Sequence, residues 1–247
     1  MEILSVNSIS KGFGEKKVLD DVSLSLQKGE LISLLGVSGA GKTTLFNCIS
    51  GILTADSGSI LLNGNNITGK PGQVSYMLQK DMLLEYKKII DNVSLPLLIS
   101  GMSKKAARKE AQKHFEEFGI AGTENMYPGE LSGGMRQRAA LLRTYLASGG
   151  VALLDEPFSA LDTITKSQMH KWYLSVMEKI DLSTIFITHD IDEAILLSNR
   201  ILILSGSPGK ITHEIIIEEK HPRVNDFNLT PEFINYKKQV IEALGTI

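Results

Sequence analysis

The sequence predicts an α/β fold with a mostly parallel sheet that is interrupted by a helical insertion. Short apolar segments alternate with helical patterns before about residue 80 and after about residue 150, as in a parallel sheet whose strands are joined by helices. Between these parts, residues 81–149 lose the strand pattern and become helical. A chain of 247 residues can form one large domain or a domain with an inserted lobe.

Individual elements follow from the period of the apolar residues. Strands are expected at residues 3–6, 22–26, 31–35, 59–62, 74–78, 151–154 and 184–187, with two more after Arg200. Helices are expected at 42–52, 103–118 and 231–244. The second helix places Ala107, Ala111 and Phe115 on one apolar stripe, and the last helix does the same with Phe233, Tyr236, Val240 and Leu244. Both stripes predict packing against the rest of the chain.

Composition narrows the possible functions. The net charge of −2 argues against a nucleic-acid binder that uses a broad basic face. Cys48 has no second cysteine to pair with, which suits a reducing compartment. The first residues lack the pattern of a secretory signal, and no apolar run reaches the roughly 18 residues that span a bilayer. Any role at a membrane is therefore expected to come through a partner.

Residues 36–43 fit the pattern G-x-x-x-x-G-K-[ST] of the phosphate-binding P-loop, between an apolar run and a predicted helix. Glycines let the backbone wrap around phosphates, and the helix N-terminus favours negative charge. In this motif Lys42 neutralises the β- and γ-phosphates and the Thr43 hydroxyl binds Mg²⁺. The expected nucleotide-binding residues here are Gly36, Val37, Ser38, Gly39, Ala40, Gly41, Lys42, Thr43 and Thr44.

Two carboxylates follow the apolar run at 151–154. A buried parallel strand delivers its carboxyl end to the ligand crevice, so Asp155 is expected to hold Mg²⁺ through water and Glu156 to act as the base that polarises the attacking water. The alternative is an acidic pair on the surface. The P-loop makes the catalytic interpretation the stronger one, because that loop requires such a partner.

Residues 131–138 read LSGGMRQR. With this segment between the P-loop and the two carboxylates, the chain resembles the ABC ATPase family, whose signature sequence is LSGGQ. The resemblance implies an ATPase with an N-terminal antiparallel β subdomain, a core at 1–80 and 150–222, an inserted helical subdomain at 81–149 and a C-terminal helical extension at 223–247. It also implies that Ser132, Gly133 and Gly134 contact the ATP of a second copy in a head-to-tail dimer. Met135 departs from the family glutamine.

Other positions match the family one by one. The resemblance implies that Gln79 reaches Mg²⁺ and the attacking water, so that Thr43, Gln79 and Asp155 surround the metal. Asp162 is expected to face the partner copy, and His189 to contact the γ-phosphate, although a lone histidine is more often an ordinary packed or surface residue. Phe13 is expected to stack on adenine, which is worth roughly 1–3 kcal/mol per base in nucleic-acid systems. The alternative for Phe13 is a packed loop aromatic.

A single nucleotide-binding unit without a membrane-spanning apolar run resembles the importer subunits of the family, in which motor and permease are separate chains. The segments 78–81, 133–138 and 155–162 resemble motors for nitrate, sulfonate and taurine, with a thiamine-precursor pyrimidine importer as a neighbour. Many such relatives have Pro-Trp where this chain has Glu85-Tyr86. The resemblance implies transmembrane permease subunits as partners, a solute-binding protein indirectly, no nucleic acid, and a peripheral place on the cytoplasmic face of the membrane.

Residues 81–86 are expected to dock the permease, with Leu83, Leu84 and Tyr86 exposed, or else to pack inside the helical lobe. An exporter motor and a soluble ABC protein of translation or DNA repair stay open as alternative functions.

Overall fold

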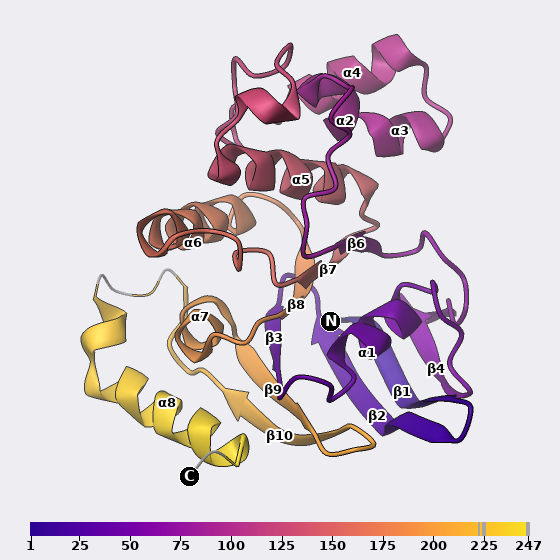
Figure 1. Cartoon of the computed structure of the whole chain (residues 1–247), viewed down its shortest axis with the longest axis vertical. Helices are drawn as coiled ribbons and strands as arrows, with labels where there is room; N and C mark the ends of the chain where they lie inside the picture. The colour runs from indigo at the N-terminus through magenta and orange to yellow at the C-terminus, as the bar shows by residue number, and fades with distance from the viewer. Residues whose placement is uncertain (222, 224–225, 246–247) are drawn as a thin grey trace.

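The computed structural model describes residues 1–221, 223 and 226–245, and its strands form two sheets (Figure 1). The first is antiparallel with the order β2-β1-β4-β5. Its strands are β1 (Glu2–Phe13), β2 (Lys16–Gln27), β4 (Ser57–Leu62) and β5 (Asn65–Asn66). The second has the order β10-β9-β3-β8-β7-β6. Its strands are β3 (Leu31–Leu35), β6 (Ser75–Met77), β7 (Val151–Asp155), β8 (Ser183–Ile187), β9 (Arg200–Ser205) and β10 (Lys210–Ile216).

The second sheet is parallel from β9 to β6, and β10 pairs antiparallel at its edge. Strands β3, β7 and β8 are buried along their whole length, which explains why they are continuous apolar runs rather than alternating ones. The expected parallel sheet and the N-terminal antiparallel sheet are both confirmed. Because β3, β8, β7 and β6 are parallel neighbours, the segments that follow them leave from the same edge.

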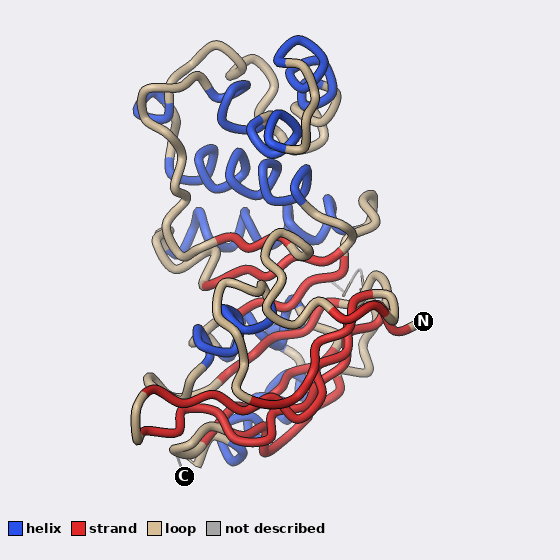
Figure 2. The backbone as a smooth tube through the Cα atoms, turned by 90° about the vertical axis from the view of Figure 1, so that its right-hand side faces the viewer, coloured by secondary structure: helices blue, strands red, loops and turns tan. Residues whose placement is uncertain are grey.

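The helices gather in two regions. Helices α2 (Ile89–Val93), α3 (Leu95–Ile99), α4 (Lys104–Gln112) and α5 (Gly133–Ala147) form one end of the molecule, away from the antiparallel sheet (Figures 1 and 2). Helices α1 (Lys42–Ile49), α6 (Thr163–Met177), α7 (Ile191–Leu197) and α8 (Pro231–Ala243) lie nearer the sheets, and short 3₁₀ turns cover Pro128–Glu130 and Phe227–Leu229. No helix among the described residues is long and apolar enough to cross a bilayer.

Two expected helices are shorter in the structure. Helix α1 ends at Ile49 rather than near residue 52, because Gly51 turns the chain away with a φ of 76°. Helix α4 covers Lys104–Gln112 rather than 103–118. After it, the chain tightens into turns in which His114 donates from its backbone to Ala111, three residues back, and these turns bury Phe115 and Phe118. The apolar stripe of Ala107, Ala111 and Phe115 is buried as expected.

Buried side chains of the described residues gather in three apolar clusters. One joins α2, α4, α5 and α6 to the parallel sheet, and a second encloses α1 together with strands from both sheets. The third joins α7 and α8 to β9 and β10. Phe233 and Val240 of α8 are buried there, and Tyr236 and Leu244 pack against them, so the predicted stripe on the last helix is confirmed.

The subdomain ranges stay a prediction. Residues 222, 224–225 and 246–247, which belong to the expected core and C-terminal extension, lie outside the described residues.

Candidate active site

The loop at residues 36–41 runs from β3 to α1 and requires glycine at both ends. A Cβ on Gly36 would lie 2.1 Å from the carbonyl oxygen of Leu204 in β9, and Gly41 has a φ of 101°, which L side chains rarely adopt. Gly41 also stands at the N-cap position without a capping side chain. The first N–H groups of α1 are therefore available to an anion.

Lys42 lies back over this loop. Its Nζ donates to the carbonyl oxygens of Gly36 at 2.7 Å and Val37 at 3.1 Å. Burial lowers the pKa of Lys42, against the opposing charges of Glu156 and Asp155. Lys42, Thr43, Asp155 and Glu156 share the lining of a cavity of about 320 Å³, so the predicted phosphate-binding loop and the predicted carboxylates face one another.

Asp155 is buried at the carboxyl end of β7, and burial raises its pKa. The hydroxyl of Tyr76 in the neighbouring strand β6 donates to Asp155 Oδ2 at 3.2 Å, and this contact and the nearby Thr43 hydroxyl both act to lower the pKa of Asp155. Sequence reasoning missed Tyr76, which looked like an ordinary strand residue. Tyr76 reaches Asp155 because β6 pairs with β7 in the register that places Tyr76 opposite Leu153.

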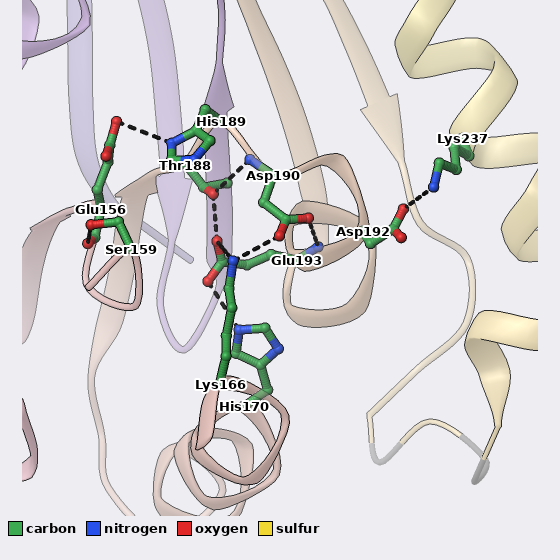
Figure 3. A network of polar contacts seen from close by, with 10 residues as sticks. All are labelled: Glu156, Ser159, Lys166, His170, Thr188, His189, Asp190, Asp192, Glu193 and Lys237. Carbon is green, nitrogen blue, oxygen red and sulfur yellow. Dashed lines mark hydrogen bonds and ion pairs between the residues drawn. The ribbon is translucent and has the colours of Figure 1, made fainter. Parts of the chain in front are cut away.

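Glu156, Gln79 and His189 come together although they follow three different strands. Gln79 Nε2 donates to Glu156 Oε2 at 3.0 Å. His189 Nδ1 lies 3.4 Å from Glu156 Oε1 (Figure 3). The backbone of Glu156 has a φ of 47°, and its N–H donates to the Ile187 carbonyl at the end of β8. The contacts of Gln79 and His189 on its two oxygens hold the carboxylate of Glu156 between these side chains.

Ser132 and Asp162 cap neighbouring helices at a second hollow. The Ser132 hydroxyl accepts from Met135 N at 3.3 Å at the start of α5, and the Asp162 carboxylate accepts from the backbone of Ile164 and Thr165 at the start of α6. Ser132, Gly133, Gly134, Met135 and Asp162 line a hollow of about 570 Å³ that is separate from the P-loop cavity. The residues expected to face a partner copy are thus gathered on one surface.

Phe13 ends β1 with its side chain about half exposed. Lys11 Nζ lies 5.7 Å from its ring centroid, and Asp56 holds the turn by accepting from Lys11 Nζ at 2.6 Å and Gly12 N at 2.7 Å. The exposed half of the ring is accessible to a base, and stacking of Phe13 on adenine stays a prediction.

The expected docking segment is exposed only in part among its described residues. Leu83 is 6% exposed and belongs to the core of the helical region, so the expectation that it faces a permease is wrong. The carbonyl and amide of Leu84 bond to the buried side chain of Asn92, which turns Leu83 inward. Met82 and Tyr86 are exposed and remain available to a partner.

Similarity to known proteins identifies the family of this chain. The family model described as "ABC transporter" matches residues 19–159, more than half of the chain. The chain belongs to the ABC transporter family. As a member, it is an ATP-binding subunit and an ATPase. The matched range contains the P-loop, Gln79, the segment with Ser132 and the carboxylates Asp155 and Glu156.

Relatives of this ABC ATPase include import subunits. The formylaminopyrimidine import ATP-binding protein ThiZ of Halalkalibacterium halodurans is 42% identical over 84% of this chain and 81% of its own. The taurine import ATP-binding protein TauB of Yersinia pestis is 35% identical over 97% of this chain and 96% of its own. A dimeric bacterial ABC transporter cassette, MJ0796, has a TM-score of 0.74 and 25% identity over 88% of this chain and 100% of its own. The expected fold and the importer group are thereby confirmed.

Proposed function

We propose that this chain couples ATP hydrolysis to the import of a small organic solute through a separate permease. The observation that carries the proposal is the meeting of Gln79, Glu156 and His189 at the edge of the sheet beside the P-loop cavity. Three polar side chains from separate strands converge on one another there, as a hydrolytic site requires.

Each predicted site residue has a distinct role in the proposed reaction. Lys42 and the N–H groups of α1 hold the phosphates, and charge complementarity favours the triphosphate. Glu156 Oε1 and Oε2 orient the attacking water and take its proton, while Gln79 positions the carboxylate. His189 offers its ring to the γ-phosphate from the same edge. Phe13 presents an exposed face on which adenine can stack.

The side-chain oxygens of Thr43 and Asp155 are ligands of the kind that Mg²⁺ prefers. This hard cation takes oxygen ligands and is usually held by one or two carboxylates together with substrate phosphates. Thr43 and Asp155 line the same cavity, and Gln79, the third expected ligand of the metal, donates to the adjacent carboxylate of Glu156. When bound, Mg²⁺ would neutralise phosphate charge. Tyr76 would keep Asp155 oriented by its hydrogen bond.

Two copies are proposed to form the working unit. The P-loop cavity and the hollow lined by Ser132 and Asp162 are different surfaces of one chain. Each offers groups that suit phosphate: helix N–H groups with an ammonium in the first, and a serine hydroxyl with glycine amides in the second. In a head-to-tail pair, each ATP would lie between the P-loop cavity of one copy and the hollow lined by Ser132 and Asp162 of the other copy.

Attachment to the membrane is proposed to be indirect and peripheral, on the cytoplasmic face. The permease would rest on the exposed side chains of Met82 and Tyr86, at the junction of the sheet with the helical region. Methionine adapts to differently shaped partners. A solute-binding protein would act through the permease and not through this chain.

The solute is proposed to be an aminopyrimidine of the kind named for ThiZ, with taurine-like sulfonates as the second candidate. The test is to co-purify the permease with the tagged chain from detergent-solubilised membranes and to rebuild the complex in vesicles with its solute-binding protein. Formylaminopyrimidine should stimulate Mg²⁺-dependent ATP hydrolysis and enter the vesicles, and taurine should do neither. ATPase activity with outward transport would indicate an exporter. Failure to recover any membrane protein would support a soluble ABC ATPase.

A further inference from the structure

Hydrogen bonds hold the loop that carries His189 on both sides of that residue. The Thr188 hydroxyl accepts from the backbone N–H of Asp190 at 3.0 Å and donates to Glu193 Oε2 (Figure 3). The Asp190 carboxylate in turn accepts from the N–H of Glu193 at 3.0 Å as the N-cap of α7. These contacts hold residues 188 and 190 but none of them reaches the imidazole of His189, which is largely exposed.

Glu193 connects this loop to a different helix. Its side chain is 4% exposed. One carboxylate oxygen lies 3.0 Å from His170 Nε2 of α6, and the other accepts a hydrogen bond from the Thr188 hydroxyl. A buried carboxylate without partners would be costly. The position of Glu193, and with it that of Thr188, therefore depends on groups that α6 supplies.

Lys166 supplies the positive charge. Its Nζ lies 2.7 Å from Asp190 Oδ2 and 3.6 Å from Glu193 Oε2, and its side chain is 19% exposed. The ammonium thus pairs with both carboxylates that fasten the loop of His189. Such a partly buried pair is screened far less than a surface pair.

The same face of α6 extends to the predicted partner surface. Asp162, Lys166 and His170 are spaced four residues apart, so they lie along one side of the helix. Asp162 is the N-cap of α6 and lines the hollow that holds Ser132. One helix therefore carries both a predicted partner-facing residue and the groups that anchor the loop of His189.

We propose that Lys166 is a positioning residue for the hydrolytic site: by pairing with Asp190 and Glu193 it fixes the loop that holds His189 against Glu156. This inference rests on the proposed role of His189 in hydrolysis. Lys166 does not touch His189 or Glu156 in the contacts described above, so any effect on catalysis must pass through Thr188, Asp190 and Glu193.

The test is a double-mutant cycle between Lys166 and His189 in the full chain. Lys166→Met keeps the length of the side chain and its helix propensity but removes the charge. We expect it to lower kcat about tenfold with KM for ATP unchanged, within the coupling range of residues in one polar network. In a His189→Ala background, the same change should cause no further loss, because the residue that it positions is gone. Lys166→Arg should restore most of the activity.

Lys171→Met is the matched control, since Lys171 is exposed on the same helix. It should behave like the wild-type chain. Histidine-selective NMR gives a readout that does not use activity: the ring signals of His189, assigned with His189→Ala, should shift in Lys166→Met and stay in place in Lys171→Met. Lys166→Gln serves for the same cycle if Lys166→Met does not fold.

Equal losses from Lys166→Met in both backgrounds, or unshifted His189 signals, would overturn the inference. Wild-type turnover in His189→Ala would instead contradict the proposed role of His189 in hydrolysis. The NMR measurement would then still test whether Lys166 holds the loop in place. The two failures are thereby distinguishable.

Discussion

The amide of Gln79 donates to the carboxylate of Glu156 at 3.0 Å, joining residues that lie 77 positions apart in the chain. Both follow neighbouring parallel strands, β6 and β7, so their meeting is a consequence of the sheet order. Since Gln79 offers N–H groups and His189 lies on the other carboxylate oxygen, Glu156 is held in a defined orientation beside the P-loop cavity.

Glu156→Gln should abolish turnover without abolishing ATP binding. An amide cannot take the proton of the attacking water, so kcat should fall by roughly 10²–10⁴-fold, as for loss of a general base. Loss of the negative charge beside the γ-phosphate should also make ATP hold two subunits together. Phosphate release and size-exclusion chromatography with ATP measure the two effects. Glu116→Gln, an exposed control, should change neither, and full activity of Glu156→Gln would reassign the base.

Phe13→Ala should weaken ATP and GTP binding to a similar degree. A stacking ring contacts the π-face that every base has, and its loss is worth roughly 1–3 kcal/mol. Fluorescence titration with both nucleotides measures the change, and Phe13→Tyr should retain the wild-type affinity. A large loss for ATP alone would show that the base is recognised by hydrogen bonds to its edges instead.

Mixing two inactive variants should restore nucleotide retention. In a head-to-tail dimer, Lys42→Ala and Ser132→Arg chains place both lesions in one composite site and leave the other site intact. Neither homodimer should retain Mg-ATP, while the heterodimer should retain it at one site. Differential tags confirm the heterodimer, and filter binding measures retention. No recovery in confirmed heterodimers would mean that each site is built within one chain.

Tyr86→Ala and Leu83→Ala should separate docking from packing. Tyr86 is 76% exposed, so its loss should leave the basal ATPase activity intact and remove stimulation by the permease. Leu83 is buried, so its truncation should destabilise the isolated chain by about 2–5 kcal/mol. Denaturant unfolding and ATPase assays with and without the permease measure both effects. Normal stimulation of Tyr86→Ala would place the docking surface elsewhere.

Acid should destabilise the chain partly through His221. Burial lowers the pKa of His221 to about 4 from its ordinary value of 6.5, and the charge of Arg223 acts in the same direction. Between these values the unfolded chain binds a proton that the folded chain does not, so stability falls as the pH decreases through this window.

The corresponding measurement is the melting temperature of His221→Leu. It should fall less than that of the wild type when the pH is lowered from 7 to about 5. His213→Leu, at an exposed position of β10, should follow the wild type. Identical pH dependence of His221→Leu and the wild type would show that His221 titrates normally in the folded chain.

The sequence by itself determined the features that are local in the chain. The glycines and Lys42 of the P-loop, the apolar strand that ends in Asp155 and Glu156, and the stripe on α8 each depend on the period of a few neighbouring residues, which short-range geometry imposes. The resemblance to a family then indicated Gln79 and His189, and the structure brings both onto Glu156.

The tertiary structure decided what depends on residues distant in the chain. Tyr76 meets Asp155 because of the register between two parallel strands, and strand order and register are not encoded in the pattern of either strand. Leu83 turns inward because Asn92 binds the backbone beside it. Lys166 reaches Asp190 and Glu193 because α6 packs beside α7. A solvated surface lysine and a partly buried, paired one look the same in a sequence, since the difference lies in the partner that the fold supplies.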